Sequence, residues 1–404
     1  MFAAMDIGSS QIRTVIAKVN EKTGMVNILG VGSSPSTGIR RGRVTDIEEA
    51  VNNITASLDE AERMSGEHVH RAWVGVGGPL VRSDDAQGVV AISGQNAEIT
   101  EEDVDRVLDA ARSVNMPSNR EILRIVPNAF SVDSQKNVKY PVGMSGIRLE
   151  VEAHIISGET GAIKNLEKTL YQTGVDISDI VPSFLAAGES VLTRRQKELG
   201  CVLVEIGACS TNLAVFEDGS VVYSSVIPVG GEHVTNDMAI GMRAAVDTAE
   251  KVKLQYGHCN PNLVTDREEV DLGALSNTDV HNVNLKLVAK MIEARYHEIF
   301  LMVRDELSRI GRDGMLPAGA ILCGGAVRMP GVLDLARESL NLPVQIGQPT
   351  TIEGITDRAA DPAFAHVIGL LQFGARYGES PSFFDFDLGR ILRSVTDFFR
   401  SLLP

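Results

Sequence analysis

Two glycine-containing turns in this chain carry residue types that could bind phosphate. The first is Asp-Ile-Gly-Ser-Ser at residues 6–10, between an expected strand at 2–5 and a second at 12–19. Backbone N–H groups and hydroxyls converge at such a hairpin tip, and glycine lets a phosphate oxygen approach the backbone closely. Asp6 adds a carboxylate that could hold a hydrated Mg²⁺ ion. Alone, this turn indicates phosphate binding only weakly, because most such turns are plain hairpins.

The same unit recurs in the second half of the chain. A strand at 201–204 leads into Glu-Ile-Gly-Ala-Cys-Ser at 205–210, and two further strands, 212–216 and 221–227, follow around an Asp-Gly hairpin turn. Each unit opens with an acidic residue, isoleucine and glycine and closes on a glycine, Gly30 or Gly230. Two antiparallel meanders of one design predict a duplicated α/β domain whose copies face each other across a cleft.

A third glycine loop and one helix complete the candidate site. An expected buried strand at 318–322 runs into Cys-Gly-Gly-Ala at 323–326. The three loops together would supply two phosphate clamps and a purine-side loop. Glu250 and Lys253 are three residues apart and share a helix face. They form either a solvated salt pair or contacts to a ribose and base, and the residues leave both interpretations open.

The elements between these turns alternate in the manner of an α/β protein. Asp247 and Glu250 predict a capping-box-like helix start. The polar stretch at about 258–284 is typical of a loop-rich insert. Hydrophobic spacing and cap residues predict strands at 25–31 and 69–76 and helices at 46–63, 100–113, 162–173, 181–192, 231–241, 247–256, 285–311 and from 330. Residues 362–377 close the globular part.

Composition narrows the functional classes. The 404 residues include 53 acidic and 38 basic side chains, a net charge of −15, which argues against nucleic acid as the main partner. No apolar run approaches the roughly 18 residues of a membrane span, and no leader precedes the first strand, so we expect a cytoplasmic protein. The four cysteines and eight histidines show no metal-ligand spacing, so neither zinc nor a disulfide framework is expected.

Further distinctive stretches are spread over nearly the whole chain: 25–32 with Gly38 and Gly42, 126–130, 141–149, 154–156, 227–231 with 233–237, and 344–347. These stretches and the glycine turns resemble the actin, hexokinase and heat-shock chaperone ATPase superfamily, and within it the FtsA family of bacterial cell-division proteins. The resemblance implies actin-like duplicated (ribonuclease H-like) domains around a nucleotide cleft, with an FtsA-type inserted subdomain and a C-terminal amphipathic helix.

The resemblance also implies how the chain is divided. The expected parts are a first actin-like domain (1–80, 159–195 and 350–378), the inserted subdomain (81–158), a second actin-like domain (196–230 and 303–349), its smaller subdomain (231–302), a linker (379–387) and the amphipathic membrane-targeting helix (388–404).

The cofactor that the resemblance implies is ATP or ADP with Mg²⁺, bound between the two halves. The implied nucleotide-binding residues are Asp6, Gly8, Ser9, Ser10, Gln11, Gly207, Ala208, Cys209, Ser210, Glu250, Lys253, Gly324, Gly325 and Ala326. Asp6 would hold Mg²⁺ through water, and Glu205 and Asn212 are the candidate catalytic residues.

The second loop departs from the family pattern Asp-x-Gly-Gly-Gly-Thr-Thr/Met-Asp. Ala208 and Cys209 add Cβ atoms where glycines would let amides reach a phosphate. Glu205 is one methylene longer than aspartate, and Asn212 lacks a charge that would help to retain Mg²⁺. We therefore expect ATP binding with slow or absent hydrolysis, because aligning a water with the phosphate is sensitive to such shifts.

The C-terminal segment predicts a membrane contact. Apolar residues recur at helical spacing with arginines opposite, which favours a membrane-surface helix over one docked on protein. The apolar face consists of Leu388, Ile391, Leu392, Val395, Phe398, Phe399, Leu402 and Leu403.

The family resemblance implies the partners and the location. They are the C-terminal peptide of the tubulin-like protein FtsZ, further copies of this chain in a filament, membrane lipid and downstream division proteins, at the cytoplasmic face of the membrane and the division septum. The peptide would dock around Arg295, Tyr296 and Glu298 on the long helix expected at 285–311. Two alternatives remain: a PilM-like actin-fold adaptor of a pilus or secretion assembly, and a small-molecule kinase of the same superfamily.

Overall fold

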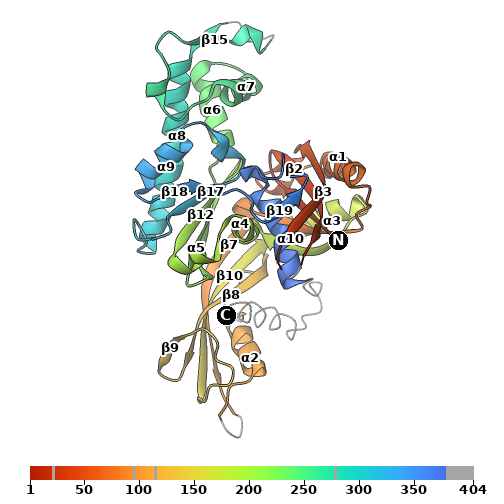
Figure 1. Cartoon of the computed structure of the whole chain (residues 1–404), viewed down its shortest axis with the longest axis vertical. Helices are drawn as coiled ribbons and strands as arrows, with labels where there is room; N and C mark the ends of the chain where they lie inside the picture. The colour runs from red at the N-terminus through yellow and green to blue at the C-terminus, as the bar shows by residue number, and fades with distance from the viewer. Residues whose placement is uncertain (21–22, 94–96, 113–115, 277–278, 280, 379–404) are drawn as a thin grey trace.

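The computed structural model describes residues 1–20, 23–93, 97–112, 116–276, 279 and 281–378. The described part is elongated, with two α/β halves side by side in the middle and a smaller subdomain beyond each end (Figure 1). The C-terminal segment, including the apolar face predicted at 388–403, lies outside the described residues.

The first half is built on a six-stranded sheet. Its order is β11 (Asp176–Pro182), β6 (Arg71–Val76), β1 (Phe2–Ile7), β2 (Gln11–Val19), β3 (Val26–Pro35) and β19 (Ile352–Gly354). Strands β1, β2 and β3 form the predicted antiparallel meander, and β6 runs parallel to β1.

Helices cover both faces of this sheet. On one face lie α1 (Ile47–Ser65) and α3 (Thr160–Gln172), and on the other lie α4 (Ser183–Val191) and α10 (Ala365–Tyr377). The contact with α1 is so close that a Cβ on Gly32 would lie 1.8 Å from the Ser57 carbonyl oxygen. Only glycine at this position lets the helix approach the strand.

The second half repeats the design with a five-stranded sheet. Its order is β14 (Ser220–Ile227), β13 (Thr211–Glu217), β12 (Cys201–Ile206), β17 (Ala320–Cys323) and β18 (Val344–Ile346). Cys201 and Leu203 face α4, whereas Val202 and Val204 face α8 (Leu285–Arg309) and α9 (Val332–Leu340). Both faces are apolar because both are covered.

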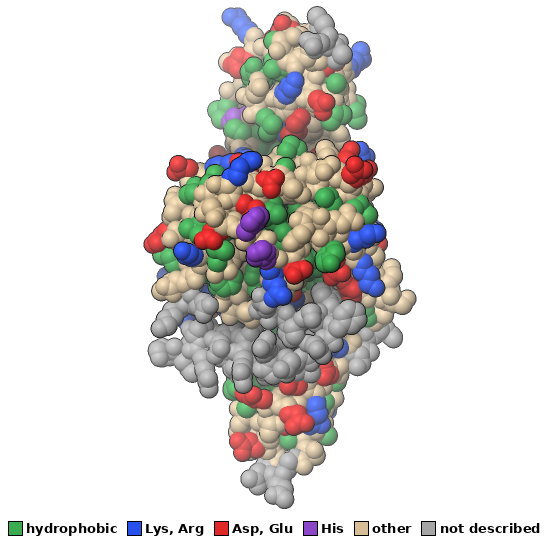
Figure 2. All heavy atoms as spheres, turned by 90° about the vertical axis from the view of Figure 1, so that its right-hand side faces the viewer, with side chains coloured by type: hydrophobic (Ala, Val, Ile, Leu, Met, Phe, Trp, Pro, Cys, Tyr) green, Lys and Arg blue, Asp and Glu red, His purple; other side chains and the backbone are tan. Residues whose placement is uncertain are grey.

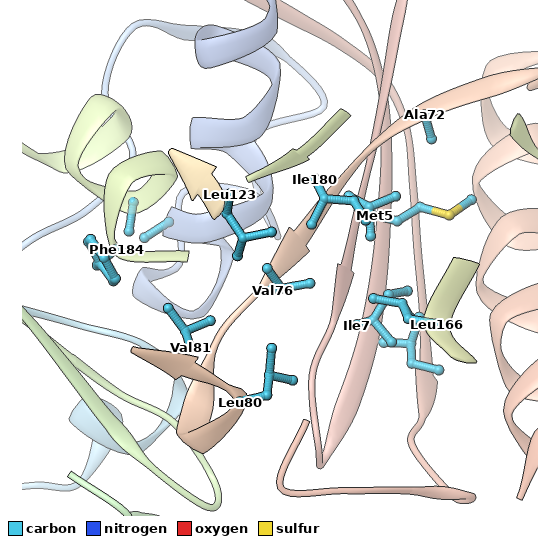
Figure 3. Close-up of a cluster of buried hydrophobic side chains, with 14 of the residues drawn as sticks. Met5, Ile7, Ala72, Val76, Leu80, Val81, Leu123, Leu166, Ile180 and Phe184 are labelled. Carbon is cyan, nitrogen blue, oxygen red and sulfur yellow. The ribbon is translucent and has the colours of Figure 1, made fainter. Parts of the chain in front are cut away.

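Helix α4 lies between the two sheets and joins their cores. Phe184 belongs to one buried cluster that contains Met5 of the first sheet and Leu203 of the second. Figure 3 shows the part of this cluster around Met5, Val76 and Phe184, where Leu123 packs from the inserted subdomain. The two halves therefore share a continuous apolar core. The helix predicted at 181–192 begins only at Ser183, because residues 181 and 182 complete β11.

The inserted subdomain has a sheet and a core of its own. Its four strands are ordered β7 (Val81–Ala91), β10 (Arg148–Glu159), β8 (Arg120–Val132) and β9 (Gln135–Val138), with α2 (Glu101–Arg112) packed against them. Side chains from all four strands and α2 form a separate buried cluster.

The subdomain at the opposite end contains α6 (Gly231–Met242), α7 (Val246–Tyr256), most of α8 and a hairpin of β15 (Glu269–Asp271) and β16 (Asn282–Asn284). The predicted capping box of Asp247 and Glu250 is wrong, because α7 begins after Ala245 without a side-chain cap. The Asp279 carboxylate, from outside the helix, accepts the Ala245 N–H at 3.2 Å instead.

Figure 2 shows acidic and basic side chains interspersed over the visible face of the middle part. Among the described residues, no helix combines the length and hydropathy that crossing a membrane requires.

Candidate functional site

The second glycine loop is attached by backbone hydrogen bonds to the first turn of α6. Within the loop, the Gly207 N–H donates to the Ser210 carbonyl at 2.9 Å. Gly231 and Glu232 at the start of α6 donate to the carbonyls of Gly207 and Ala208 at 2.9 and 2.8 Å. A Cβ on the preceding Gly230 would lie 2.5 Å from the Gly207 carbonyl oxygen. The loop and the helix N-terminus, which attracts anions, therefore form one unit.

The first loop meets the second across the interface between the halves. Ser9 accepts the Gly42 N–H at 3.2 Å, and its hydroxyl lies within hydrogen-bonding reach of the Cys209 thiol. A Cβ on Gly78 would lie 3.3 Å from the Ser210 hydroxyl. The first and second loops are thus neighbours at this interface, and the Ser210 hydroxyl lies beside Gly78.

The third loop completes the convergence. Gly324 has a φ of 92° in the left-handed region, and a Cβ there would lie 2.5 Å from the Ile206 carbonyl oxygen. A Cβ on Gly231 would lie 3.4 Å from the Cβ of Ala326. By contrast, a Cβ on Gly325 would meet no neighbour closer than the Cβ of Ala363, at 3.9 Å. Gly324 is therefore required by packing, whereas Gly325 borders open space.

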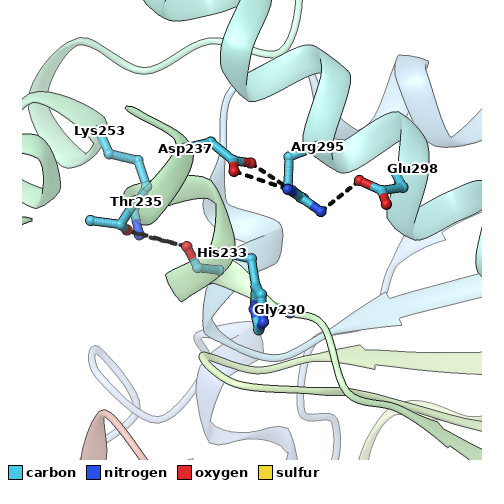
Figure 4. A network of polar contacts seen from close by, with 8 residues as sticks. Gly230, His233, Thr235, Asp237, Lys253, Arg295 and Glu298 are labelled. Atoms are coloured by element: carbon cyan, nitrogen blue, oxygen red, sulfur yellow. Dashed lines mark hydrogen bonds and ion pairs between the residues drawn. The ribbon is translucent and has the colours of Figure 1, made fainter. Parts of the chain in front are cut away.

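Glu250 and Lys253 belong to this convergence. Lys253 Nζ lies 2.6 Å from Glu250 Oε2 and donates to the Thr235 hydroxyl at 2.8 Å and to the Gly231 carbonyl at 3.2 Å. Only 11% of the Lys253 side chain is exposed, against 41% for Glu250. Figure 4 shows Lys253 reaching Thr235 near the N-terminal end of α6. Lys253 is thus a largely buried cation beside the second loop, paired with a partly exposed Glu250.

The carboxylate of the first loop is fully engaged. Asp6 accepts from His366 Nδ1 at 3.0 Å on one oxygen and from Arg13 at 3.2 Å on the other. Burial alone would raise the pKa of Asp6, but the attraction of His366 and Arg13 outweighs it and lowers that pKa. Asp6 therefore already pairs with two basic side chains, and its contact with Mg²⁺ through water stays a prediction. The described residues also contain no cluster of three His, Cys, Asp or Glu side chains that would hold a metal ion.

Glu205 and Asn212, the departures in the second unit, form a matched pair. Asn212 Nδ2 donates to Glu205 Oε2 at 2.9 Å and to the Ser183 hydroxyl at 3.1 Å. Its Oδ1 accepts the Gly78 N–H at 3.1 Å from the root of the inserted subdomain. An aspartate could accept the last bond but could not donate the first two. Asn212 therefore ties the second half to α4 and to the first half.

Cys209 is also held in place by its surroundings. Its thiol donates to Glu232 Oε2 at 3.0 Å. Burial, followed by the neighbouring Glu232 carboxylate, raises the pKa of the Cys209 thiol. It is therefore a protonated donor and not a reactive thiolate.

The three residues predicted to dock a partner have different environments. Tyr296 is only 1% exposed, and its hydroxyl donates to the Ala326 carbonyl at 2.6 Å. Its side chain cannot contact a partner, so this part of the prediction is corrected. Arg295 pairs with Asp237 of α6 at 2.6 Å and with Glu298 at 2.6 Å, and all three side chains are partly exposed (Figure 4).

The sequence reasoning missed several residues at this convergence. His366 and Arg13 hold Asp6, and the Gly77–Gly78 stretch contacts Asn212 and Ser210. The Gly-rich run after the strand ending at Val76 was an available signal. No local pattern marks His366, which is 360 residues from its partner.

Comparison with known proteins places this geometry in a family. Residues 202–369 match the family model of the cell division protein FtsA, and residues 78–157 match the SHS2 domain inserted in FtsA, close to the insertion expected at 81–158. The chain is 37% identical to the FtsA of Bacillus subtilis over 93% of this chain and 84% of that protein. It is 35% identical to that of Pseudomonas aeruginosa, covering 93% and 89%.

Solved structures agree on the fold. A PilM–PilN type IV pilus biogenesis complex superposes with a TM-score of 0.68 at 15% identity, covering 93% of this chain and 98% of that one. The MreB5 of Spiroplasma citri gives 0.51 at 15% identity, covering 92% and 95%. At these identities the likeness shows the actin-like fold alone, whereas the curated relatives decide the family. The chain belongs to the FtsA family of actin-like cell-division proteins.

Proposed function

We propose that this protein binds ATP or ADP between its two halves, assembles with further copies of itself, and anchors FtsZ filaments to the cytoplasmic membrane at the division septum. The observation that carries the nucleotide part is the convergence of three loops from distant parts of the chain, the second and third of them at the N-terminus of α6. Two of these loops present hydroxyls, and Lys253 supplies a packed positive charge beside them.

In this proposal the loop backbones and the hydroxyls of Ser9 and Ser210 contact the phosphates, and Glu250 and Lys253 lie beside the ribose. The Gly324–Ala326 loop borders the base. Gln11 remains a proposed contact beside the first loop. The solved MreB5 structures are described as bound to ADP and to AMPPNP, which makes nucleotide a reasonable ligand for this fold.

Mg²⁺ would reach the site with the nucleotide, where it neutralises phosphate charge. The side chains here do not offer it a free ligand set, since Asp6 is held by His366 and Arg13 and Glu205 accepts from Asn212. We therefore assign no step to the ion. Hydrolysis is slow or absent in this proposal, because Asn212 and Cys209 are fixed in other contacts.

Membrane attachment is assigned to residues 388–403, and the FtsZ peptide to the exposed part of α8 around Arg295 and Glu298. The curated relatives favour this function over the adaptor and kinase alternatives, since they are cell division proteins matched over nearly their full length. The PilM likeness, at 15% identity, does not restore the adaptor alternative.

Nucleotide binding is tested by isothermal titration calorimetry with ATP on wild type and on Gly325→Trp. The indole would fill the open space at this loop, so we expect ATP affinity to fall by at least about tenfold, equivalent to 1.4 kcal/mol. Gly161→Trp, at a position where a Cβ meets nothing within 4 Å, is the matched control. Equal ATP affinity in all three proteins would remove the nucleotide from this site.

A further inference from the structure

The inserted subdomain contacts both halves of the molecule, and its contact with the second half includes a polar cluster in which His154 and Ser224 are buried, whereas 74% of the Asp85 side chain is exposed. His154 on β10 is only 2% exposed. Its Nδ1 lies 2.8 Å from Asp85 Oδ1 on β7, and its Nε2 lies 2.8 Å from the Ser224 hydroxyl on β14. The Ser224 hydroxyl also pairs with that of Ser83 on β7 at 2.5 Å. We call these four residues the relay.

The order acid, histidine, serine in the relay resembles that of acyl-transfer enzymes, but its setting does not. Ser224 is only 4% exposed, and its hydroxyl is already paired with Ser83. A nucleophile has to reach a substrate, so the relay is suited to holding surfaces together. If β14 separated from the inserted subdomain, His154 Nε2 and Ser83 would lose the Ser224 hydroxyl, while His154 Nδ1 would keep Asp85; the loss at the buried His154 makes separation costly.

The other side of the inserted subdomain is attached to the first half. Arg124 on β8 pairs with Asp179 on β11. Arg120 donates to the Leu80 carbonyl at 3.1 Å, where the chain enters the insertion, and to the Ser157 carbonyl within the insertion at 2.8 Å. The subdomain therefore bridges the halves, with the relay on one side and these arginines on the other.

The strand that carries Ser224 also leads to the nucleotide-binding loops. β14 ends at Ile227, and the chain continues through residues 228–229 to Gly230. A Cβ on Gly230 would lie 2.7 Å from the Ala208 carbonyl oxygen of the second loop. The second loop therefore lies against the segment that continues directly from the strand held by the relay.

We propose that the relay is a latch by which the inserted subdomain holds the two halves in the arrangement where the first and second loops meet. Breaking the relay lets the halves separate more readily, and locking it prevents them from separating. The latch itself is defined by contacts within the protein. Only the nucleotide-release measurement described below rests on the proposed function.

The test uses one full-length protein in two states. In Ser83→Cys/Ser224→Cys, a disulfide formed under oxidising conditions locks the latch and a reductant releases it. The four native cysteines are buried, which limits side reactions. Ser224→Ala breaks the latch permanently, and Ser220→Ala at the start of the same strand is the matched control.

The readout is the rate at which a fluorescent ADP analogue dissociates, followed by stopped flow. We expect Ser224→Ala to release it at least about fivefold faster than wild type, the factor that corresponds to one buried hydrogen bond of about 1 kcal/mol. The oxidised double variant should release it more slowly than the reduced one. Equal rates in wild type, Ser224→Ala and both redox states would overturn the latch.

A second measurement separates failure of the latch from failure of nucleotide binding. Hydrogen exchange of the β7, β10 and β14 amides is followed without nucleotide. Faster exchange at these amides in Ser224→Ala, but not in Ser220→Ala, supports the latch even if no nucleotide binds. Unchanged protection in Ser224→Ala overturns it.

Discussion

Asp6 and His366, which are 360 residues apart in the chain, form a buried pair with 3.0 Å between Oδ1 and Nδ1. Burial would lower the pKa of His366, but the attraction of Asp6 outweighs it and raises that pKa. The pKa of Asp6 is lowered in return. The first glycine loop is therefore attached to the start of α10, so that the N-terminal and C-terminal segments of the first half close together beside the proposed phosphate site.

Replacing His366 with leucine should destabilise the protein by about 3 kcal/mol at pH 6, because Asp6 then keeps only Arg13 as a partner in a buried site. Urea unfolding at pH 6 measures this change.

The pair also predicts a pH dependence of stability. His366 has a raised pKa in the folded state, so its contribution to the free energy of unfolding is complete below its unfolded pKa of about 6.5 and is lost as pH rises through the folded value. Asp6 has a lowered pKa, so its contribution is lost as pH falls below about 4. A His366→Leu protein that kept the wild-type stability and pH profile would contradict the pair.

Asn212→Asp alone should lower stability by about 1–3 kcal/mol, because two carboxylates would then meet where the amide donates to Glu205. The quadruple variant Glu205→Asp/Ala208→Gly/Cys209→Gly/Asn212→Asp restores the family pattern of the second loop. We expect this variant to release phosphate from ATP at least about tenfold faster than wild type, which corresponds to a barrier lowered by about 1.4 kcal/mol. Phosphate release by wild type at about 10 per second, the median enzyme rate, would instead contradict slow turnover.

Arg295→Glu should weaken binding of the FtsZ C-terminal peptide, measured by fluorescence anisotropy, by about tenfold. It also places a glutamate against Asp237, so the folded state must be checked by circular dichroism. Arg304→Glu is the matched control, since Arg304 lies on the same helix and pairs with Asp313 instead. If both variants bound the peptide equally well, the docking site would have to be sought away from Arg295.

Phe398→Asp/Phe399→Asp should release the full-length protein from anionic liposomes, because charge would enter the centre of the predicted apolar face. Arginines alone cannot hold it there, since each basic residue near an anionic surface contributes only about 1 kcal/mol and the protein carries a net charge of −15. Co-sedimentation with vesicles measures the change, and unaltered ATP affinity is the control. Co-sedimentation at the wild-type level would show that the segment binds protein and not lipid.

Asp105 on α2 has a pKa raised to about 6, by burial first and then by Asp109 and Glu101. A raised carboxyl pKa means that the folded state binds an extra proton between pH 4 and 6, so stability falls as pH rises through this window. Asp105→Asn should remove this slope and stabilise the protein at pH 8 by less than about 1 kcal/mol, since the group is only partly buried. Thermal unfolding at pH 5 and 8 measures both, and an unchanged slope would refute the assignment.

Local sequence determined much of this protein. The duplicated strand-turn-strand units, the main helices and the three glycine loops follow from hydrophobic spacing and turn residues, because these depend on neighbours within a few positions. Both meanders are confirmed, as is the actin-like fold with its inserted subdomain. The pattern was less informative where an element's end is decided by packing, as where β11 takes up two residues expected in α4.

Only the tertiary structure decided how the polar side chains pair. Spacing correctly predicted that Glu250 and Lys253 share a helix face, but not that Lys253 would be packed on Thr235. The family resemblance placed Tyr296 at a partner-binding surface, whereas its side chain is buried. Asp6 reads as a metal ligand in sequence, yet its partner lies near the other end of the chain. Hydrogen bonds and burial depend on which distant segments come into contact in the folded protein. Hydrophobic periodicity along the chain does not specify these long-range contacts.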